Sequence, residues 1–290
     1  MSSLLPAVAS RLFVRTRLAS ADPLDGAYAS LQRGRSDDFE DLREYEYGDD
    51  VRDIDWNATA RQGEIFVRRS RARRMHTLLV AVDTGRGMAA LSPDERPKRD
   101  LAVLATGVLA LLALRHGDAV SVVYGDANGT RRIPGRRSEG AIEHALRTIR
   151  DATTEAVASS RTQLLGDIAR TVSRRAILVI VTGEDPITAD EERLVRRLRA
   201  QHDVLWLAIR DADPTGPGTR ADADSGWRVP AFLRGNDRVA SELADERDRA
   251  DAERARTLDA LGISHAALEH ADTATAAILG MLAGRPRVSS

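Results

Sequence analysis

From residue 77 onward, short aliphatic runs alternate with stretches whose apolar residues recur at helical spacing. The aliphatic runs predict strands in the segments TLLVAVD (77–83), GDAVSVVYG (117–125), AILVIVTG (176–183), DVLWLAI (203–209) and SHAALEH (264–270). Helical spacing predicts helices near 99–116, 142–149, 164–173, 188–201 and 237–261, and a last helix after residue 270. Such alternation is typical of a doubly wound, mostly parallel sheet of class α/β.

Turn and cap signals refine this prediction. Residues 129–135 (GTRRIPG) fit a short edge strand, because Asn128 and Gly129 form a turn signal. Thr188 and Glu191 fit a capping box. Residues 211–235 are rich in Asp, Gly and Pro, which indicates an inserted loop. Residues 1–76 lack the alternation, so we expect an N-terminal region over 1–76 that packs on an α/β domain over 77–285.

Composition narrows the possible chemistry. The 290 residues are 42% hydrophobic and 30% charged with a net charge of -1, as in globular proteins without an electrostatic preference for nucleic acid. The chain has no cysteine, which excludes disulfides, thiolate catalysis and cysteine zinc sites. Lys98 is the only lysine, and we attribute this first to genome composition. The N-terminal apolar patch lacks the residue order of a secretory signal, and no apolar run is long enough to span a bilayer. We therefore expect a cytoplasmic protein.

The glycines after Asp83 pose a specific question. Residues 85–90 (GRGMAA) formally satisfy the dinucleotide pattern G-x-G-x-x-(G/A). That pattern binds a pyrophosphate only where a helix starts at once, whereas Ser92 and Pro93 predict a helix start near Pro97. No acidic residue ends a second strand about twenty residues further on. We therefore do not predict a nucleotide site.

The segment DFEDLREYEYGDDVRDIDWNATARQGEIFVR (38–68) resembles the signature of the bacterial domain-of-unknown-function family 58. The matching positions are Phe39, Leu42, Arg43, Glu44, Tyr45, Gly48, Asp49, Asp50, Arg52, Ile54, Asp55, Trp56, Thr59, Ala60, Arg61, Gly63 and Val67. The resemblance covers about residues 20–285. Up to residue 88 it rests on matching motifs, and after that on the order of the predicted strands and helices. It implies a von Willebrand factor A-like domain and service as adaptor or delivery partner of a MoxR-type AAA+ ATPase.

Domains of that type often carry a metal-ion-dependent adhesion site. Its ligands are an Asp-x-Ser-x-Ser run, a later threonine and a final aspartate. The resemblance places these five positions at Asp83, Gly85, Gly87, Thr162 and Gly183. Because Mg²⁺ needs oxygen ligands and glycine offers no side-chain oxygen, we expect a degenerate site and no cofactor. Residual Mg²⁺ binding, through Asp83, Thr162 and Asp185, is the alternative.

The signature segment also holds candidate chemistry. Its carboxylates could form a metal-dependent hydrolytic centre (Glu44, Glu46, Asp49, Asp50, Asp53 and Asp55). We favour an internal charge network with Arg43, Arg52, Arg61, Arg68 and Arg69, and hence a protein that is not an enzyme. We expect Trp56 to be buried against the α/β domain, with an exposed partner anchor as the alternative.

The function expected from the sequence is therefore a non-catalytic protein-interaction module. The candidate partner-binding residues are Arg43, Glu44, Tyr45, Asp49, Asp50, Asp55, Trp56 and Arg61, together with the strand ends around Asp83, Gly85 and Thr162. Neither nucleic acid nor a membrane is an expected partner.

Overall fold

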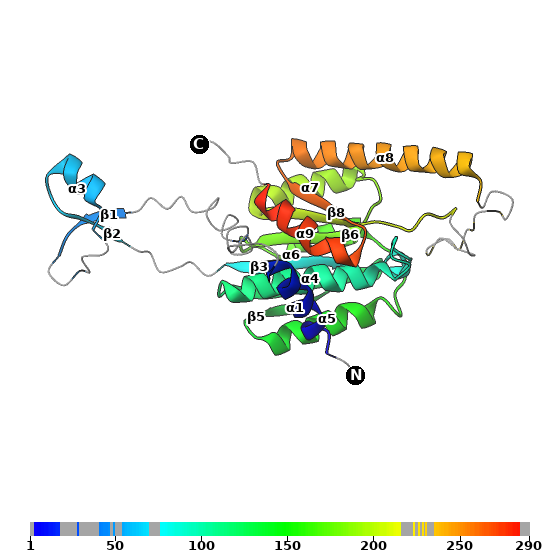
Figure 1. Cartoon of the computed structure of the whole chain (residues 1–290), viewed down its shortest axis with the longest axis horizontal. Helices are drawn as coiled ribbons and strands as arrows, with labels where there is room; N and C mark the ends of the chain where they lie inside the picture. Colours follow the sequence, from blue (N-terminus) through cyan, green and yellow to red (C-terminus); the bar gives the residue numbers. More distant parts are fainter. Residues whose placement is uncertain are drawn as a thin grey trace.

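The computed structural model describes residues 3–17, 28, 41–46, 49, 54–69, 76–215, 223, 226, 228, 230 and 235–284 (Figure 1). A six-stranded sheet of order β5-β4-β3-β6-β7-β8 lies at its centre. The strands are β3 (Thr77–Asp83), β4 (Ala119–Asp126), β5 (Gly129–Arg136), β6 (Ile177–Gly183), β7 (Asp203–Ile209) and β8 (Ser264–Leu268). All neighbours are parallel except the β4–β5 hairpin. The predicted α/β class is confirmed.

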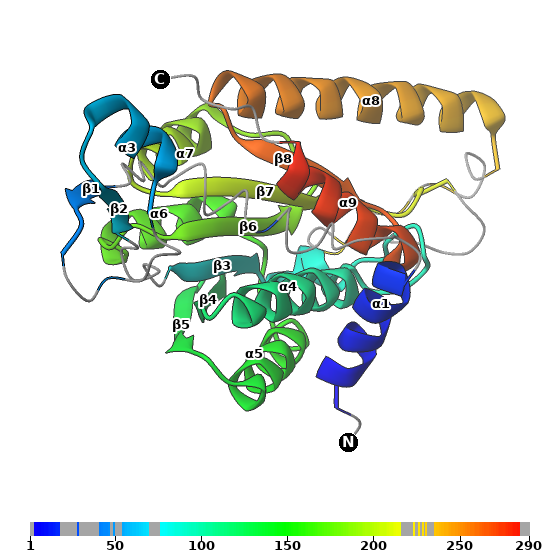
Figure 2. The same cartoon turned by 60° about the vertical axis from the view of Figure 1, so that its left-hand side comes forward.

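Helices cover both faces of the sheet (Figure 2). One layer holds α1 (Leu5–Arg17), α4 (Lys98–Arg115), α5 (Glu139–Ala152) and α9 (Ala271–Ala283). The other holds α6 (Arg161–Thr171), α7 (Ala189–Gln201) and α8 (Asp237–Ala260). Side chains alternate along a strand, so Val80 and Val82 enter the first core while Leu79 and Ala81 enter the second. This arrangement explains why β3 is apolar between Thr77 and Asp83.

Local signals set several boundaries as predicted. Helix α4 begins at Lys98, directly after Pro97, and does not follow β3 at once. The Thr188 hydroxyl and the Glu191 carboxylate form the expected capping box of α7. β5 is the antiparallel edge strand that the Asn128-Gly129 turn signal predicted, and Gly129 has a φ of 130°. No helix in the described part of the chain combines the length and apolarity needed to cross a membrane.

Helix α1 packs into the α/β core; the sequence analysis expected the N-terminal region to pack on the α/β domain but predicted no helix there. Its Leu5, Val8 and Leu12 are buried against α4, α5 and α9. A Cβ atom at Gly107 of α4 would lie 2.9 Å from Val8 Cγ1, so the two helices approach closely only because residue 107 is glycine. The Glu143 carboxylate of α5 accepts the Leu5 amide at 2.8 Å and thereby caps the start of α1.

Part of the signature segment forms a small unit of three elements (Figure 1). Strand β1 (Asp41–Glu44) pairs antiparallel with β2 (Phe66–Arg69), and α3 (Trp56–Gln62) lies between them in the chain. Asp55 caps α3, because its Oδ1 accepts the Ala58 amide at 3.0 Å. The Phe66 amide donates to Thr59 Oγ1 at 3.1 Å and ties α3 to β2.

Candidate functional site

The carboxyl ends of β3, β6 and β7 meet at one edge of the sheet, because these strands are parallel and adjacent. Asp83 ends β3 and is only 5% exposed. Its Oδ1 accepts the Gly85 amide at 2.8 Å and so fixes the following loop. The loop continues as a short 3₁₀ helix, η2 (Arg86–Ala89).

Gly85 is required by a close approach of the loop between α5 and α6. A Cβ at Gly85 would lie 2.3 Å from Ser159 Cα and 2.5 Å from Ser159 Oγ, closer than real Cβ atoms come. The Arg86 amide also donates to the Val157 carbonyl at 2.7 Å, which holds the two loops together. The space that a serine side chain at 85 would need is therefore taken by Ser159.

The Ser159 hydroxyl lies beside the Asp83 carboxylate. It is close enough to favour the charged form of Asp83, but not in hydrogen-bond geometry. Among the residues that the structure describes, this buried Oγ has no hydrogen-bond partner. A hydroxyl thus faces the predicted site after all, but it comes from a loop that the sequence did not point to.

A buried ammonium group lies at the same edge. Lys98 Nζ is 2.6 Å from Asp211 Oδ1, and its side chain is 5% exposed. A Cβ built at Gly183 would lie 3.4 Å from Lys98 Nζ and 3.2 Å from Asp185 Oδ2. The lysine therefore stands next to the position at which the resemblance expects the final metal-binding aspartate.

Burial dominates the electrostatics of these carboxyl groups. It raises the pKa of Asp83, although the Gly85 amide, Ser159, Lys98 and Arg161 all act in the opposite direction. Burial also raises the pKa of Asp211, again against the charge of Lys98. The nearby cations therefore limit the rise in the pKa of both carboxyl groups but do not reverse it.

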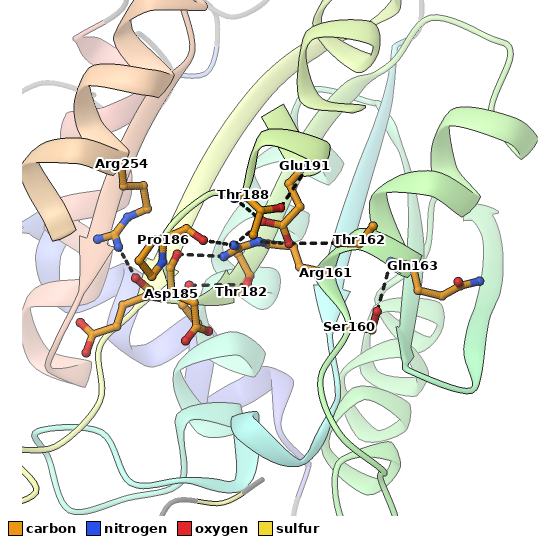
Figure 3. Close-up of polar contacts among 12 residues, drawn as sticks. Ser160, Arg161, Thr162, Gln163, Thr182, Asp185, Pro186, Thr188, Glu191 and Arg254 are labelled. Carbon is orange, nitrogen blue, oxygen red and sulfur yellow. Dashed lines mark hydrogen bonds and ion pairs between the residues drawn. The ribbon is translucent and has the colours of Figure 1, made fainter. Parts of the chain in front are cut away.

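Arg161, the first residue of α6, links this helix to the segment after β6 (Figure 3). Its guanidinium donates to both Glu191 carboxylate oxygens, at 2.9 and 2.6 Å, and to the Asp185 carbonyl at 3.0 Å. It also lies over the Trp206 ring, 5.6 Å from the centroid. The Thr162 hydroxyl donates to Glu191 at 3.4 Å, so this predicted ligand position faces the Arg161–Glu191 pair.

A second charge cluster extends the site toward α8. Arg210 contacts Glu184 at 3.5 Å, Glu269 at 2.8 Å and also Asp251. Arg247 reaches the same Glu184 at 3.5 Å. Burial raises the pKa of Glu184, an effect that Arg247 opposes. Acidic and basic groups at this edge thus neutralise one another.

The residues present do not match the ligand set of a metal-ion-dependent adhesion site. At the positions that the resemblance assigns to the two serines, the chain has Gly85 and Gly87, and Ser159 backbone atoms leave no room for a side chain at Gly85. The Lys98 ammonium would repel a divalent ion beside Asp211. Within the described part of the chain, no group of three or more His, Cys, Asp or Glu side chains is arranged to hold a metal. No chemical step through a metal follows from this geometry.

The expected burial of Trp56 against the α/β domain is wrong. Trp56 is 65% exposed, and Ile65 of the same unit is 45% exposed. Trp56 is the first residue of α3, directly after the Asp55 cap, and its ring is left in solvent. The alternative, an exposed aromatic side chain, is the one observed.

The remaining signature candidates form no hydrolytic centre in the part that is described. Glu44 and Glu46 are exposed, Tyr45 is half-buried, Arg61 is exposed, and Asp49 accepts the Glu46 amide at 2.9 Å. The side chains of Arg43, Arg68 and Arg69, as well as Asp50, Arg52 and Asp53, lie outside the described residues. So does most of the expected 211–235 loop.

Sequence reasoning missed four residues that build the site, namely Lys98, Ser159, Arg161 and Asp211. One signal was available, because Lys98 is the only lysine in the chain. Nothing in the local sequence marks Ser159 or Asp211, since both reach the site through loops whose paths depend on tertiary packing.

The fold and the site define an α/β protein whose polar centre lies at the carboxyl ends of the central parallel strands. The chain belongs to the family described as "Protein of unknown function DUF58", which matches residues 41–219.

Relatives and solved structures resemble the chain at lower identity. Uncharacterized proteins Rv1480 of Mycobacterium tuberculosis and Mb1516 of Mycobacterium bovis are each 29% identical over 216 residues, which cover 70% of this chain and 66% of theirs. The chain thus spans slightly less than two thirds of these relatives.

Among solved structures, a von Willebrand factor type A protein from Catenulispora acidiphila is 14% identical with a TM-score of 0.43, and the match covers 73% of this chain and 43% of that one. BatB from Bacteroides thetaiotaomicron is 12% identical with a TM-score of 0.41, covering 71% and 97%.

Proposed function

We propose that this protein is a cytoplasmic, non-catalytic interaction module that serves as partner or adaptor of a MoxR-type AAA+ ATPase. Its metal-ion-dependent adhesion site is degenerate, and it engages its partner without a metal. The observation that carries the proposal is the exposure of Trp56 and Ile65 on the signature unit. Exposed aromatic side chains are the usual anchors of protein interfaces, because they bury a large area on binding.

The charge pairing at the sheet edge supports the non-catalytic part of the proposal. General acid–base or nucleophilic catalysis needs a reactive group that can reach a substrate. Here Glu191 is bound by Arg161, Asp211 by Lys98, and Glu184 by Arg210 and Arg247. These pairs hold the loops in place and leave the surface shape as the property that a partner can recognise.

The identity of the partner rests on the resemblance of residues 38–68 to the family signature. The test is affinity capture from the native host with the tagged chain, in one arm with ATP and Mg²⁺ and in another with EDTA and no nucleotide. We expect a MoxR-type AAA+ ATPase in at least one arm. Its absence from both would refute the partnership.

A matched pair of variants tests the surface. Trp56→Ala should lower capture on the order of tenfold or more, as for an interface hot spot. Leu243→Ala removes a 40% exposed side chain on α8 and should leave capture unchanged. Equal capture by wild type and Trp56→Ala would show that the signature unit is not the docking surface.

A further inference from the structure

Three strand-end loops converge on Lys98. Asp83 ends β3, Asp185 follows β6 and Asp211 follows β7. The Lys98 ammonium is 2.6 Å from Asp211 and acts on the charge of Asp83. It shares the space beside Gly183 with Asp185, because both groups lie within 3.4 Å of the point where a Cβ would stand.

The backbone holds the lysine in this place. The Lys98 amide donates to the Ala90 carbonyl at 2.8 Å, so the start of α4 is tied to the loop after β3. The Ala212 amide donates to the Leu91 carbonyl at 2.8 Å and ties the segment after β7 to that same loop. The ammonium is thus presented to the carboxylates by a braced framework rather than by a free surface side chain.

We propose that the Lys98 ammonium is a built-in cation that stands in the place of a divalent metal ion and joins the ends of β3, β6 and β7. This inference deepens the proposed function, because it explains how the site remains assembled without a metal. It also assigns a role to the buried Ser159 hydroxyl, which adds a further oxygen beside Asp83.

The chemistry of the side chain supports the assignment. An ammonium is a compact charge with three donors, whereas a guanidinium is planar and directs its bonds as a fork. A compact charge suits carboxylates that approach from three different loops. The chain contains 43 Lys and Arg residues, and the single lysine among them is the one at this site. Composition alone does not explain why the exception is placed here.

A tethered cation also excludes a free one. The ammonium lies 2.6 Å from Asp211 Oδ1 and shares the space beside Gly183 with Asp185, which is a candidate metal ligand. A metal would have to displace a charge that is covalently attached, and so always present, while losing its own hydration shell. The wild-type site should therefore be indifferent to divalent ions.

The test replaces the charge by an apolar chain of similar length, Lys98→Met. In EDTA the melting temperature should fall by roughly 3 to 10 °C, because one partner of a half-buried ion pair is lost. Excess Mn²⁺ or Mg²⁺ should raise the melting temperature of Lys98→Met, since the carboxylates can then share a metal. The wild type should melt at the same temperature in EDTA and in either metal.

Two controls locate the effect. Arg96→Met removes one positive charge from an exposed side chain of the same loop and should show neither the loss nor the metal response. Lys98→Met combined with Asp83→Asn should lose the metal response, because a ligand is removed. If Lys98→Met does not fold in EDTA, it is refolded in the presence of Mn²⁺ or Mg²⁺, which should restore folding. Failure to fold with either metal overturns the inference.

The inference is also overturned if Mg²⁺ or Mn²⁺ raises the melting temperature of the wild type and Asp83→Asn abolishes that rise. It is overturned equally if Lys98→Met melts like the wild type in EDTA, or folds but ignores both metals. None of these measurements requires a partner, so failure here is distinguishable from failure to capture an ATPase.

Discussion

Gly85→Ala tests whether Ser159 fills the space that a side chain at residue 85 would need. If it does, the site differs from an adhesion site in its packing as well as in its ligands. The φ of Gly85 is −65° and its ψ is 171°, so the backbone itself allows alanine. The conflict is steric, because the added Cβ would lie 2.3 Å from Ser159 Cα and 2.6 Å from Ser159 N. Ser159 Oγ can rotate away, but these backbone atoms cannot.

The size of the effect follows from the displacement required. Carbon atoms in contact lie about 3.5 to 4.0 Å apart, so the loops must separate by more than about 1 Å. Overpacking of this kind costs about 3 kcal/mol, and loss of the bond from Arg86 to Val157 adds about 1 kcal/mol. Alanine also makes the unfolded chain less flexible than glycine does, which stabilises the folded state by roughly 0.4 to 1 kcal/mol. We therefore expect a net loss of about 3 kcal/mol.

Urea denaturation of wild type and variant measures this loss as a lower midpoint. The matched control is Gly166→Ala in α6, where nothing lies within 4 Å of an added Cβ and where alanine should stabilise by about 0.5 to 1 kcal/mol. Gly85→Ser should behave like Gly85→Ala, since both carry the clashing Cβ. A Gly85→Ala midpoint equal to or above that of the wild type would refute the packing argument.

Three further changes probe the framework around the site. Gly107→Ala places a Cβ 2.9 Å from Val8 Cγ1 and should lower the free energy of unfolding by about 1 to 3 kcal/mol; an unchanged urea midpoint would contradict the close α1–α4 contact. Burial alone would raise the pKa of Glu143, but hydrogen bonds from the Leu5 amide, the Arg147 side chain and the Leu4 amide lower it from 4.5 to about 2. The folded-state pKa lies below the unfolded value, and the difference corresponds to at most about 3 kcal/mol. This contribution is complete above pH 4.5 and is lost as the pH falls through 2, so thermal melts of wild type and Glu143→Gln should converge over that window. Arg161→Met leaves Glu191 buried without its ion-pair partner and should cost about 3 to 5 kcal/mol, whereas Arg161→Met combined with Glu191→Leu should recover most of the loss in a double-mutant cycle.

The α/β part of the fold could be predicted because its signals are local. β3, β6 and β7 are buried on both faces, so they appear as uninterrupted aliphatic runs. Pro97 marks the start of α4, and Thr188 with Glu191 marks the start of α7. Each of these features is decided within one helical turn or one strand, which is the range that sequence periodicity can report.

The features that were missed are decided over longer distances. The α1 segment is short and carries arginines, and only its contacts with α4, α5 and α9 show that it belongs to the core. Gly85 and Ser159 lie close together although they are 74 residues apart in the sequence, and no local pattern predicts such a contact. Trp56 was expected to be buried because tryptophan usually is, yet its place at the start of α3 leaves it exposed.

The same edge of the sheet can hold either a metal or a network of internal charges, and the choice determines what can regulate it. A site that needs a divalent ion responds to the concentration of that ion, since binding and metal occupancy are linked. A site closed by Lys98 and Arg161 has its cations attached to the chain, so ionic conditions change it only through screening. If the proposed function holds, control by divalent ions is not expected at this edge, and the exposed Trp56 of the signature unit is the place to look for the effect of a partner.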